Sequence, residues 1–370
     1  MSRLHCGIVG GGYAGLTAAI QLSRLKDCKV TLLDRNTSFL KKISTYRLLD
    51  TPLSDLQIPY ERIAKKHGFD FIQSESNAKE VLKSLPDDSA IRQDALLGAF
   101  DVLVFATGAR TASFVESESD PAFTIESIIT NPVALHARLA DAEEPGIGFL
   151  GGGATSVQFA MQIKDSLANK GVASRIDLVT AGSSLLPEFP AQFGQYVHRV
   201  CRAQKITVHY MSRCTQMNAT SMTFQRMDGS AKKIGYDLVF NFSGVKAAPL
   251  ALQCNQYGQV LADGRTLENI YAIGDCSEFQ GAGSNTKSAQ SAVRKALCAV
   301  EHIQATYLQT SAARAYHYQD LGYFISLGQK DAIGWLLDKR VIATGRSALA
   351  IKEAIANQFA LFLEGYNTYV

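Results

Sequence analysis

Two short glycine-rich segments of the same kind constrain what this chain can fold into. They are Gly10–Gly15 (GGGYAG) and Gly151–Ser156 (GGGATS), and each follows an apolar run and precedes a stretch with helical spacing. In that strand–turn–helix context the turn wraps the pyrophosphate of a dinucleotide, because the helix N-terminus offers free N–H groups. One copy would be weak evidence. Two copies predict that one polypeptide holds two dinucleotides, so that electrons can pass between them.

The composition is that of an ordinary globular protein. The chain has 370 residues, a length sufficient for two or three domains. Of these residues 46% are hydrophobic and 19% are charged. A net charge of +3 without a clustered Lys/Arg run argues against a nucleic-acid partner. The seven cysteines form no C-x-x-C pair, which indicates reduced thiols and a cytoplasmic location. The dispersed histidines predict no metal site, and no apolar run reaches the roughly 18 residues needed to cross a bilayer.

The first glycine-rich turn lies in a predicted β-α-β unit. Residues 4–9 predict a strand, 16–25 a helix and 29–33 a second strand. Asp34 and Arg35 follow that strand, at the place where a carboxylate accepts hydrogen bonds from ribose hydroxyls.

Within this turn each glycine has a separate expected purpose. Gly10 permits the tight turn, Gly12 lets the backbone approach a phosphate, and Gly15 lets helix and strand pack closely. Tyr13 and Ala14 complete the predicted binding turn. The alternative is a glycine loop beside an ordinary surface aspartate.

The second turn is less regular. Ser156 replaces the third glycine, and the predicted binding residues are Gly151, Gly153, Ala154, Thr155 and Ser156. Its unit consists of a strand at 146–150, a helix at 154–168 and a strand at 175–179. The second strand runs into Thr180 with no acid, and no arginine follows to meet a 2′-phosphate. The sequence therefore leaves NADH and NADPH open, and a packing turn without a ligand is the alternative.

Three further apolar strands end in small residues. Residues 101–105 run into Ala106-Thr107-Gly108, residues 237–242 into Ser243-Gly244, and residues 269–273 into Gly274-Asp275. A carboxylate at such a strand end can accept from a ribityl hydroxyl or a phosphate-bound water. Each segment alone is weak evidence, since Gly-Asp is common in turns.

The remaining segments complete the prediction. Residues 36–58 are less regular, and hairpin strands are expected between residue 74 and about Gly98. The predicted helices are 59–67 with Pro59 in the first position, one around 127–141, one near 192–204, one from Lys287 to Ile303, and a last one at 347–363; the further predicted strands are 69–73, 206–210, 221–225 and 323–327.

Taken in order, these segments resemble the two-dinucleotide-domain flavoproteins of the pyridine nucleotide-disulfide oxidoreductase fold. Within that superfamily the chain is most similar to the branch of type II NADH dehydrogenases and apoptosis-inducing-factor-like proteins, and the missing C-x-x-C argues against the disulfide reductases. The resemblance covers residues 4 to about 300, and residues 324–328 and 344–346 resemble the tail of bacterial members. The resemblance rests on residues 7–15, 104–108, 151–156, 242–245 and 271–275.

The resemblance implies an α/β fold with two Rossmann-like three-layer domains, one inserted in the other, plus a small C-terminal region. Residues 1–111 and 246–310 would bind FAD, residues 112–245 would bind NADH or NADPH, and residues 311–370 would form the C-terminal region. Hydride would pass from NAD(P)H to the flavin, and electrons would then pass to a small-molecule acceptor, for which a quinone is a candidate. Backbone amides of Ala289 and Gln290 would stabilise negative charge on the flavin, and Gly108, Gly244, Gly274 and Asp275 would line the cofactors.

Some positions depart from the branch. Gln158 stands where the branch usually has a glutamate beside the nicotinamide–flavin contact, and an amide there can orient but cannot carry a proton. With Thr180, this keeps two alternatives open: a ferredoxin-type reductase, and a non-catalytic flavin-binding redox sensor. Cys276 could act as a thiol relay, although a small buried residue is favoured.

The last predicted helix has an apolar face, formed by Leu349, Ile351, Ile355, Phe359, Phe362 and Leu363. We interpret it as packing on the core or on a second subunit of a homodimer, in preference to peripheral membrane contact.

Overall fold

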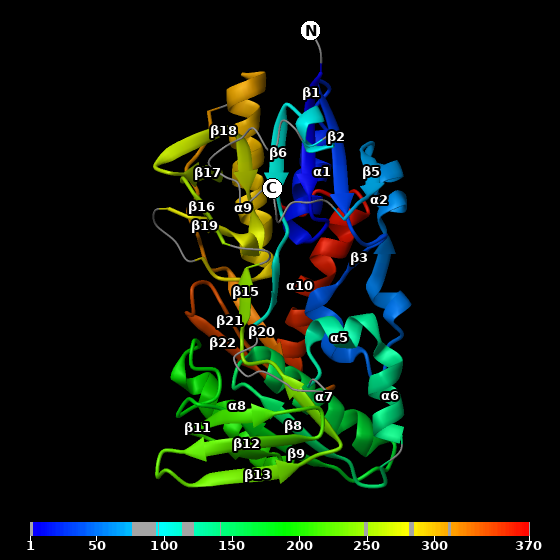
Figure 1. Cartoon of the computed structure of the whole chain (residues 1–370), viewed down its shortest axis with the longest axis vertical. Helices are drawn as coiled ribbons and strands as arrows, with labels where there is room; N and C mark the ends of the chain where they lie inside the picture. Colours follow the sequence, from blue (N-terminus) through cyan, green and yellow to red (C-terminus); the bar gives the residue numbers. More distant parts are fainter. Residues whose placement is uncertain are drawn as a thin grey trace.

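The computed structural model describes residues 3–75, 94, 96–112, 122–140, 142–247, 251–280, 285–309 and 312–369. Its two main sheets lie one above the other, with the N-terminal end of the chain at the top of the upper one (Figure 1). The C-terminal helix α10 (Gly345–Leu363) extends between the upper and lower parts (Figure 1). The predicted hairpin strands between residue 74 and Gly98 lie largely outside the described residues.

The upper sheet has the strand order β19-β16-β17-β18-β6-β1-β2-β5, and the five strands from β18 to β5 are parallel. Long apolar runs form these central strands because helices α1 (Tyr13–Ser23) and α9 (Ala289–Ile303) cover one face of the sheet. The strands are β1 (Leu4–Val9), β2 (Cys28–Asp34), β5 (Asp70–Gln73), β6 (Val102–Phe105), β16 (Leu252–Cys254), β17 (Gln259–Ala262), β18 (Arg265–Ala272) and β19 (Ser277–Phe279).

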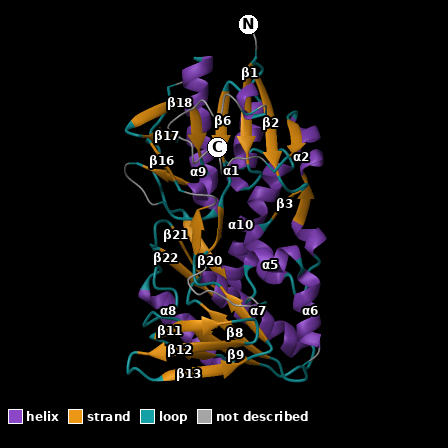
Figure 2. Ribbon diagram, viewed as in Figure 1, coloured by secondary structure: helices purple, strands orange, loops and turns teal. Residues whose placement is uncertain are grey.

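The lower sheet is a parallel one with the order β10-β9-β8-β14. Its strands are β8 (Gly146–Leu150), β9 (Arg175–Val179), β10 (Thr207–His209) and β14 (Leu238–Asn241). An antiparallel sheet of β11 (Ser212–Met217), β12 (Ser221–Arg226) and β13 (Ala231–Gly235) lies beside it (Figure 2). The helices of this part are α5 (Ile125–Thr130), α6 (Pro132–Ala140), α7 (Ala154–Asn169) and α8 (Ala191–Ala203).

A two-stranded ribbon links the two parts. Strands β7 (Ala109–Thr111) and β15 (Val245–Ala247) pair antiparallel, so that the chain enters and leaves the lower part side by side. The predicted domain boundaries at 111–112 and 245–246 fall in this ribbon, and the domain division itself stays a prediction.

The C-terminal region consists of an antiparallel sheet of β20 (Gly322–Ser326), β21 (Ala332–Leu336) and β22 (Val341–Thr344), followed by α10. The side chains of Phe359, Phe362 and Leu363 are buried in the core of the upper part, whereas Ile355 is exposed. Most of the predicted apolar face of this helix is therefore occupied by the core of its own chain.

The region between β2 and β5 contains short elements that carry part of the site. They are β3 (Ser38–Leu40), the 3-10 helices η1 (Lys42–Arg47) and η2 (Leu53–Leu56), β4 (Gln57–Pro59) and helix α2 (Tyr60–His67). Helix α2 ends, as predicted, at Gly68, whose φ of 76° is left-handed.

Several predicted helix bounds were wrong. The first helix begins at Tyr13 instead of residue 16, because the glycine turn leads directly into it. The late helix begins at Ala289 instead of Lys287, because the Ser288 side chain caps it by accepting from the Ser291 N–H. Pro59 is the N-cap of α2 and not its first residue. The helix predicted around 127–141 is divided at Pro132 into α5 and α6, with residue 141 outside the described residues.

Candidate functional site

The first glycine turn contains two glycines that the fold itself requires. Gly10 has a φ of 108°, and a Cβ there would lie 2.4 Å from the carbonyl oxygen of Ala106. A Cβ at Gly15 would lie 1.8 Å from the carbonyl oxygen of Gly10. Any side chain at either position would collide with backbone, as the sequence predicts for a tight turn packed against a strand.

Gly12 differs from both of these glycines. Its φ of −73° and ψ of −167° suit any residue, and a Cβ there would meet no described atom within 4 Å. The polypeptide therefore gives no reason for a glycine at this position. Open space in front of an N-cap glycine is what a closely bound phosphate group needs.

The N-terminus of α1 also suits an anion. No side chain caps this helix at Gly12, and its first turn has no acidic residue. Helix N-terminal N–H groups without a protein acceptor carry a positive partial charge. The chain thus fits the pyrophosphate of a dinucleotide at this turn.

Asp34 lies against the same turn. Its Oδ2 accepts a hydrogen bond from the Gly11 N–H at 2.7 Å, and its Oδ1 accepts from the backbone and side-chain nitrogens of Asn36. The Tyr60 hydroxyl donates to the Gly11 carbonyl at 2.9 Å and so closes the turn from the other side. These contacts fix the carboxylate where a ribose would lie, with lone pairs left for its hydroxyls. The neighbouring Arg35 side chain is exposed.

The second turn repeats this backbone. Gly151 has a φ of 124°, and a Cβ there would lie 2.4 Å from the Phe242 carbonyl oxygen. Gly153 has a φ of −83° and, like Gly12, would place a Cβ in open space. No side chain caps α7, which starts with Ala154, Thr155 and Ser156.

Ser156 supports a ligand at this second turn. Its hydroxyl is fully buried, and among the described residues it has no hydrogen-bond partner. A Cβ on Gly151 would be 3.0 Å from it, so the oxygen lies against the turn. A buried hydroxyl without a partner is costly, and a water or a bound nucleotide would satisfy it.

Two other predicted segments meet at the first turn, and a third lies at the corresponding place beside the second turn. Ala106 donates its N–H to the Val9 carbonyl at 2.7 Å, and Thr107 and Gly108 follow it out of β6. A Cβ on Gly274 would lie 3.0 Å from the Ala14 Cβ, which places the Gly274-Asp275 turn beside the start of α1. In the lower part, Phe242 donates to the Leu150 carbonyl at 2.8 Å, so Ser243 and Gly244 occupy the corresponding place.

Asp275 is a half-buried carboxylate in this group. Burial raises the pKa of Asp275, and Lys42, Lys295 and Lys287 partly offset that effect. The start of α9, with Ala289 and Gln290 half-buried, follows the same loop.

Lys295 on α9 was missed by the sequence reading, because a lysine within a helix predicts a solvated side chain. It is 2% exposed, and its ammonium donates to the Ser277 carbonyl at 2.8 Å, to the Ser277 hydroxyl at 3.3 Å and to Asn285 Oδ1 at 2.9 Å. The Ser277 hydroxyl in turn donates to the Gly274 carbonyl at 2.7 Å. Lys295 therefore ties the Gly274-Asp275 turn to α9.

Replacing Lys295 with methionine should lower the free energy of unfolding by ~1–3 kcal/mol, because buried acceptors lose their donor. Urea titrations of the wild type and the variant measure this. Lys26→Met, at an exposed lysine after α1, is the control and should leave the midpoint unchanged. Equal midpoints for Lys295→Met and the wild type would contradict the structural role of the ammonium.

Gln158 lies where the lower part meets the C-terminal region. Its Nε2 donates to the Ser326 hydroxyl at 3.2 Å, and Lys352 Nζ donates to the same hydroxyl at 3.1 Å. Lys352 also donates to the Tyr46 hydroxyl at 2.6 Å. One network of hydrogen bonds thus joins α7 of the lower part, β20 and α10 of the C-terminal region, and η1, which lies between β2 and β5 in the sequence.

Two members of this hydrogen-bonded network, Lys352 and Tyr46, have shifted pKa values. Burial lowers the pKa of Lys352, although Tyr46 and Glu353 partly oppose the effect. Burial would raise the pKa of Tyr46, but Lys352 and Arg47 bring that pKa below its usual value. Both pKa values therefore lie below their usual values, and perturbed pKa values of this kind cluster at functional sites.

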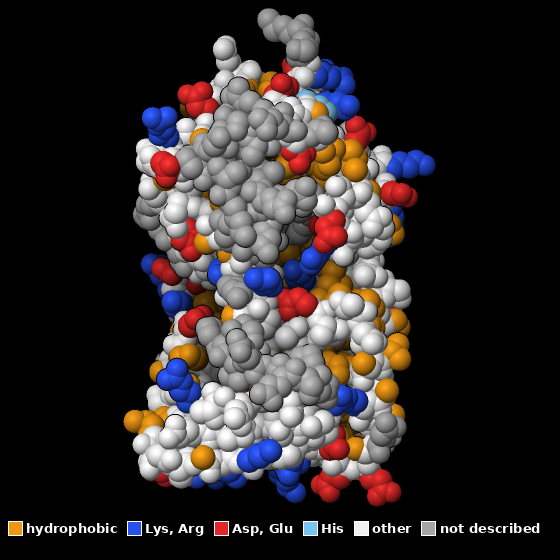
Figure 3. Space-filling view, in the orientation of Figure 1, with side chains coloured by type: hydrophobic (Ala, Val, Ile, Leu, Met, Phe, Trp, Pro, Cys, Tyr) orange, Lys and Arg blue, Asp and Glu red, His pale blue; other side chains and the backbone are white. Residues whose placement is uncertain are grey.

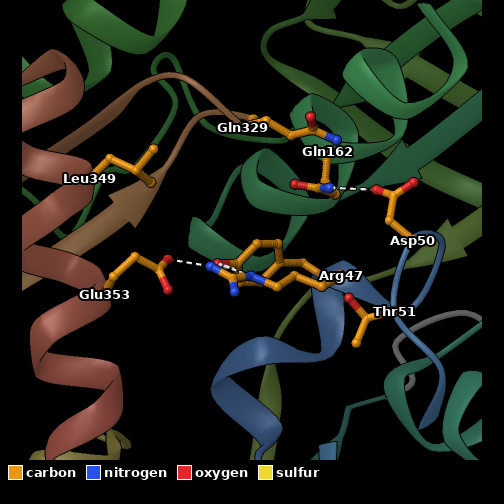
Figure 4. A pocket seen from close by; sticks show the side chains of 9 residues that line it. Arg47, Asp50, Thr51, Gln162, Gln329, Leu349 and Glu353 are labelled. Atoms are coloured by element: carbon orange, nitrogen blue, oxygen red, sulfur yellow. Dashed lines mark hydrogen bonds and ion pairs between the residues drawn. The ribbon is translucent and has the colours of Figure 1, made fainter. Parts of the chain in front are cut away.

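A pocket of about 310 Å³ adjoins this network of hydrogen bonds, because Tyr46 belongs to both (Figure 4). Across it Arg47 of η1 forms an ion pair with Glu353 of α10, and Gln162 of α7 donates to Asp50 Oδ2 at 2.6 Å (Figure 4). Its lining residues are Tyr46, Arg47, Asp50, Thr51, Gln162, Gly328, Gln329, Leu349 and Glu353.

Cys276 is fully buried, and its thiol donates to backbone carbonyls of Phe105 and Ile273. Burial raises the pKa of Cys276, which disfavours the thiolate that a relay needs. Within the described ranges, no group of His, Cys, Asp and Glu side chains comes together as a metal site would require. The same ranges contain no helix whose length and hydropathy would suit a membrane span.

Comparison with known proteins agrees with this geometry. Residues 4–296 match the family described as pyridine nucleotide-disulphide oxidoreductase. The chain belongs to this family. The predicted α/β fold class is thereby confirmed, as are the enzyme class and the use of FAD with a nicotinamide nucleotide at the level of the family.

Individual relatives are distant but cover nearly the whole chain. A type II NADH:quinone oxidoreductase of Staphylococcus aureus is 24% identical over 382 residues, covering 94% of this chain and 93% of that protein. The sulfide:quinone oxidoreductase of Aquifex aeolicus has a similar fold, with a TM-score of 0.79 at 16% identity, covering 98% and 92%. NDH2 of Plasmodium falciparum, solved with NADH, has a TM-score of 0.78 at 14% identity, covering 96% and 94%.

Proposed function

We propose that this protein is an FAD-dependent NAD(P)H dehydrogenase that delivers electrons to a quinone. The observation that carries the proposal is the pair Gly12 and Gly153: each stands in front of an uncapped helix, in a conformation open to any residue, with empty space where a side chain would be. A quinone acceptor is supported by the name of the Staphylococcus aureus relative, which shares nearly the full length of the chain.

The repeated geometry supports one dinucleotide in each part, and the order of the two follows the family resemblance. Residues 1–111 and 246–310 would hold FAD, residues 112–245 the nicotinamide nucleotide, and residues 311–370 would complete the acceptor side. The FAD contacts would come from Gly10, Gly12, Tyr13, Ala14, Gly15, Asp34, Arg35, Ala106, Thr107, Gly108, Gly274, Asp275, Ala289 and Gln290, and the nucleotide contacts from Gly151, Gly153, Ala154, Thr155, Ser156 and Gly244.

When bound, FAD would accept a hydride from the nicotinamide and release the two electrons to the acceptor. The side chains of this protein position the reactants and exclude water. Gln158, the candidate catalytic residue, would orient the nicotinamide through its amide. Because an amide carries no proton at neutral pH, the proton for the acceptor must come from another group.

Lys352 is the group best placed to supply that proton. Its ammonium is held by Tyr46 and Ser326 beside the pocket that Arg47 and Glu353 close, and its lowered pKa makes it a better acid than a free lysine. Quinone reduction consumes two protons, so a lysine hydrogen-bonded to Tyr46, which lines the pocket, suits this acceptor.

The ferredoxin-type alternative would need a basic docking surface. On the face shown in Figure 3, the coloured Lys/Arg and Asp/Glu side chains are interspersed. The redox-sensor alternative is tested below. A cytoplasmic location, a homodimer and the disfavoured membrane contact stay predictions from the sequence.

Anaerobic mixing of the purified yellow protein with NADH or NADPH tests the proposal. Bleaching of the flavin absorbance by either nucleotide, followed by recovery on addition of a soluble quinone, is the expected result. Flavin that neither nucleotide bleaches would favour the redox sensor. Recovery with ferredoxin and not with quinone would favour the ferredoxin-type reductase.

A further inference from the structure

The two dinucleotide units match residue by residue at the end of their second strands. The Gly10 N–H donates to the Leu33 carbonyl at 2.8 Å, and the Gly151 N–H donates to the Val179 carbonyl at 2.9 Å. The residue after the acceptor is Asp34 in the first unit and Thr180 in the second. Thr180 therefore occupies the place that the carboxylate holds in the first unit.

The side chains at this place also correspond. Asp34 Oδ2 accepts from the Gly11 N–H, whereas a Cβ on Gly152, the glycine that matches Gly11, would lie 2.6 Å from Thr180 Oγ1. The Thr180 hydroxyl thus lies against the turn as the carboxylate does, but without charge. A carboxylate at this place binds the ribose 2′-hydroxyl of NAD and repels a 2′-phosphate. The second unit lacks that repulsion.

The loop after Thr180 is held in place at both of its ends. The Met211 N–H donates to the Gly182 carbonyl at 3.0 Å, and the Leu186 N–H donates to the Gly152 carbonyl at 2.8 Å. Ser183 and Ser184 between these ties are exposed. No acidic residue occurs from Leu178 to Pro187. A fixed loop with free hydroxyls and no negative charge suits a phosphate.

An arginine from a distant part of the sequence stands one residue away from a backbone contact with this loop. The Ser212 N–H donates to the Thr180 carbonyl at 2.9 Å, which brings the start of β11 against the end of β9. The next residue, Arg213, is exposed. The sequence reading found no arginine after the strand, because β11 follows only after α8 and β10. A guanidinium is the side chain best suited to a phosphate group.

We propose that the second unit accepts NADPH at least as efficiently as NADH. Thr180 carries no negative charge that would repel the 2′-phosphate of NADPH, and Arg213 binds that phosphate. The inference rests on the proposed function, since it concerns the nucleotide of the same site. It departs from the Staphylococcus aureus relative, whose name specifies NADH, and from the Plasmodium falciparum structure, which was solved with NADH.

Rapid mixing of the oxidised holoprotein with each nucleotide, without oxygen, tests the inference. The wild type should be reduced by NADPH with an efficiency equal to or above that with NADH. Thr180→Asp should lower the NADPH efficiency about 100-fold, because juxtaposed like charges cost several kcal/mol, and should leave the NADH efficiency within about threefold. Ala181→Asp, at an exposed neighbouring position, gives the same test if the buried Thr180 variant folds poorly.

Arg213→Gln should lower the NADPH efficiency about tenfold without changing that for NADH, because it removes one charge-assisted contact. Arg265→Gln, an exposed arginine on β18 in the other unit, is the matched control. Calorimetric titration with adenosine 2′,5′-bisphosphate and with 5′-AMP gives a second readout that needs no electron transfer. The wild type should bind the bisphosphate more tightly than 5′-AMP. Arg213→Gln should bind the two ligands with equal affinity.

The outcomes separate the two claims. A wild type that prefers NADH more than 100-fold would overturn the inference and leave the dehydrogenase intact. An unchanged NADPH efficiency in Arg213→Gln would overturn the assignment of the phosphate contact. Flavin that neither nucleotide reduces would instead contradict the proposed function.

Discussion

Gly12→Asp should yield a folded protein that has lost its flavin. The new side chain fits the apoprotein, because φ is −73° and no described atom lies within 4 Å of the added Cβ. It would place a carboxylate where we expect the pyrophosphate, and like-charge contact costs several kcal/mol. We expect an affinity for FAD weaker by ~10³-fold or more, measured by titrating deflavinated protein with FAD and following flavin fluorescence.

Gly153→Asp is the reciprocal variant. It should keep its flavin and lose reduction by both nicotinamide nucleotides, because Gly153 holds the same place in the second unit. Gly235→Asp on β13 is the control, since a Cβ there also meets open space but no glycine turn surrounds it. A Gly12→Asp protein with undiminished FAD affinity would show that the first turn does not hold the cofactor.

Lys352→Met should separate the two halves of the reaction. Reduction of the flavin by NAD(P)H should stay within about twofold of the wild type, while quinone turnover falls ~100-fold, within the usual range for loss of a proton donor. Stopped-flow spectroscopy measures the first step and steady-state assay the second. Lys330→Met, at an exposed lysine between β20 and β21, controls for loss of a positive charge nearby.

The pH dependence gives the same residue a sharper test. Lys352 donates only when protonated, so quinone turnover should decline as the pH rises through its pKa, which burial places below the usual 10.5. Lys352→Arg keeps the cation beside Tyr46 but does not release a proton at these pH values. The arginine variant should therefore be slow and lack this decline. An arginine variant as fast as the wild type would mean that charge alone matters and that the proton comes from elsewhere.

The parts of the fold that local patterns control could be predicted from the sequence. Gly10 and Gly15 mark a turn because backbone carbonyl groups lie too close to leave room for a Cβ at either residue. The apolar run of residues 101–105 predicts the buried parallel strand β6. The predicted strands at 4–9, 146–150 and 175–179 match β1, β8 and β9. The first residue of a helix was harder to predict, because one side chain can determine it. At α9 the Ser288 hydroxyl accepts from the Ser291 N–H and so fixes the start of the helix at Ala289.

The proposed acceptor side of the site could not be predicted, because its residues meet only through long-range contacts. Tyr46, Ser326 and Lys352 come from three different elements, and although Ser326 lies in the segment that resembles the tail of bacterial members, no local pattern predicts that the three meet. Lys295 and Arg213 escaped notice for the same reason: burial and strand pairing, which no local pattern encodes, give them their surroundings. Motifs with a fixed spacing identified the cofactors, whereas the residues proposed for nucleotide specificity and proton supply come together only through tertiary contacts.

Direct analysis of the purified protein for bound flavin tests the central claim. Denaturing the protein and separating the supernatant by chromatography should release FAD in an amount equal to that of the polypeptide, and Gly12→Asp should release none. A wild type that folds, contains no isoalloxazine and takes up none from added FAD would contradict the account.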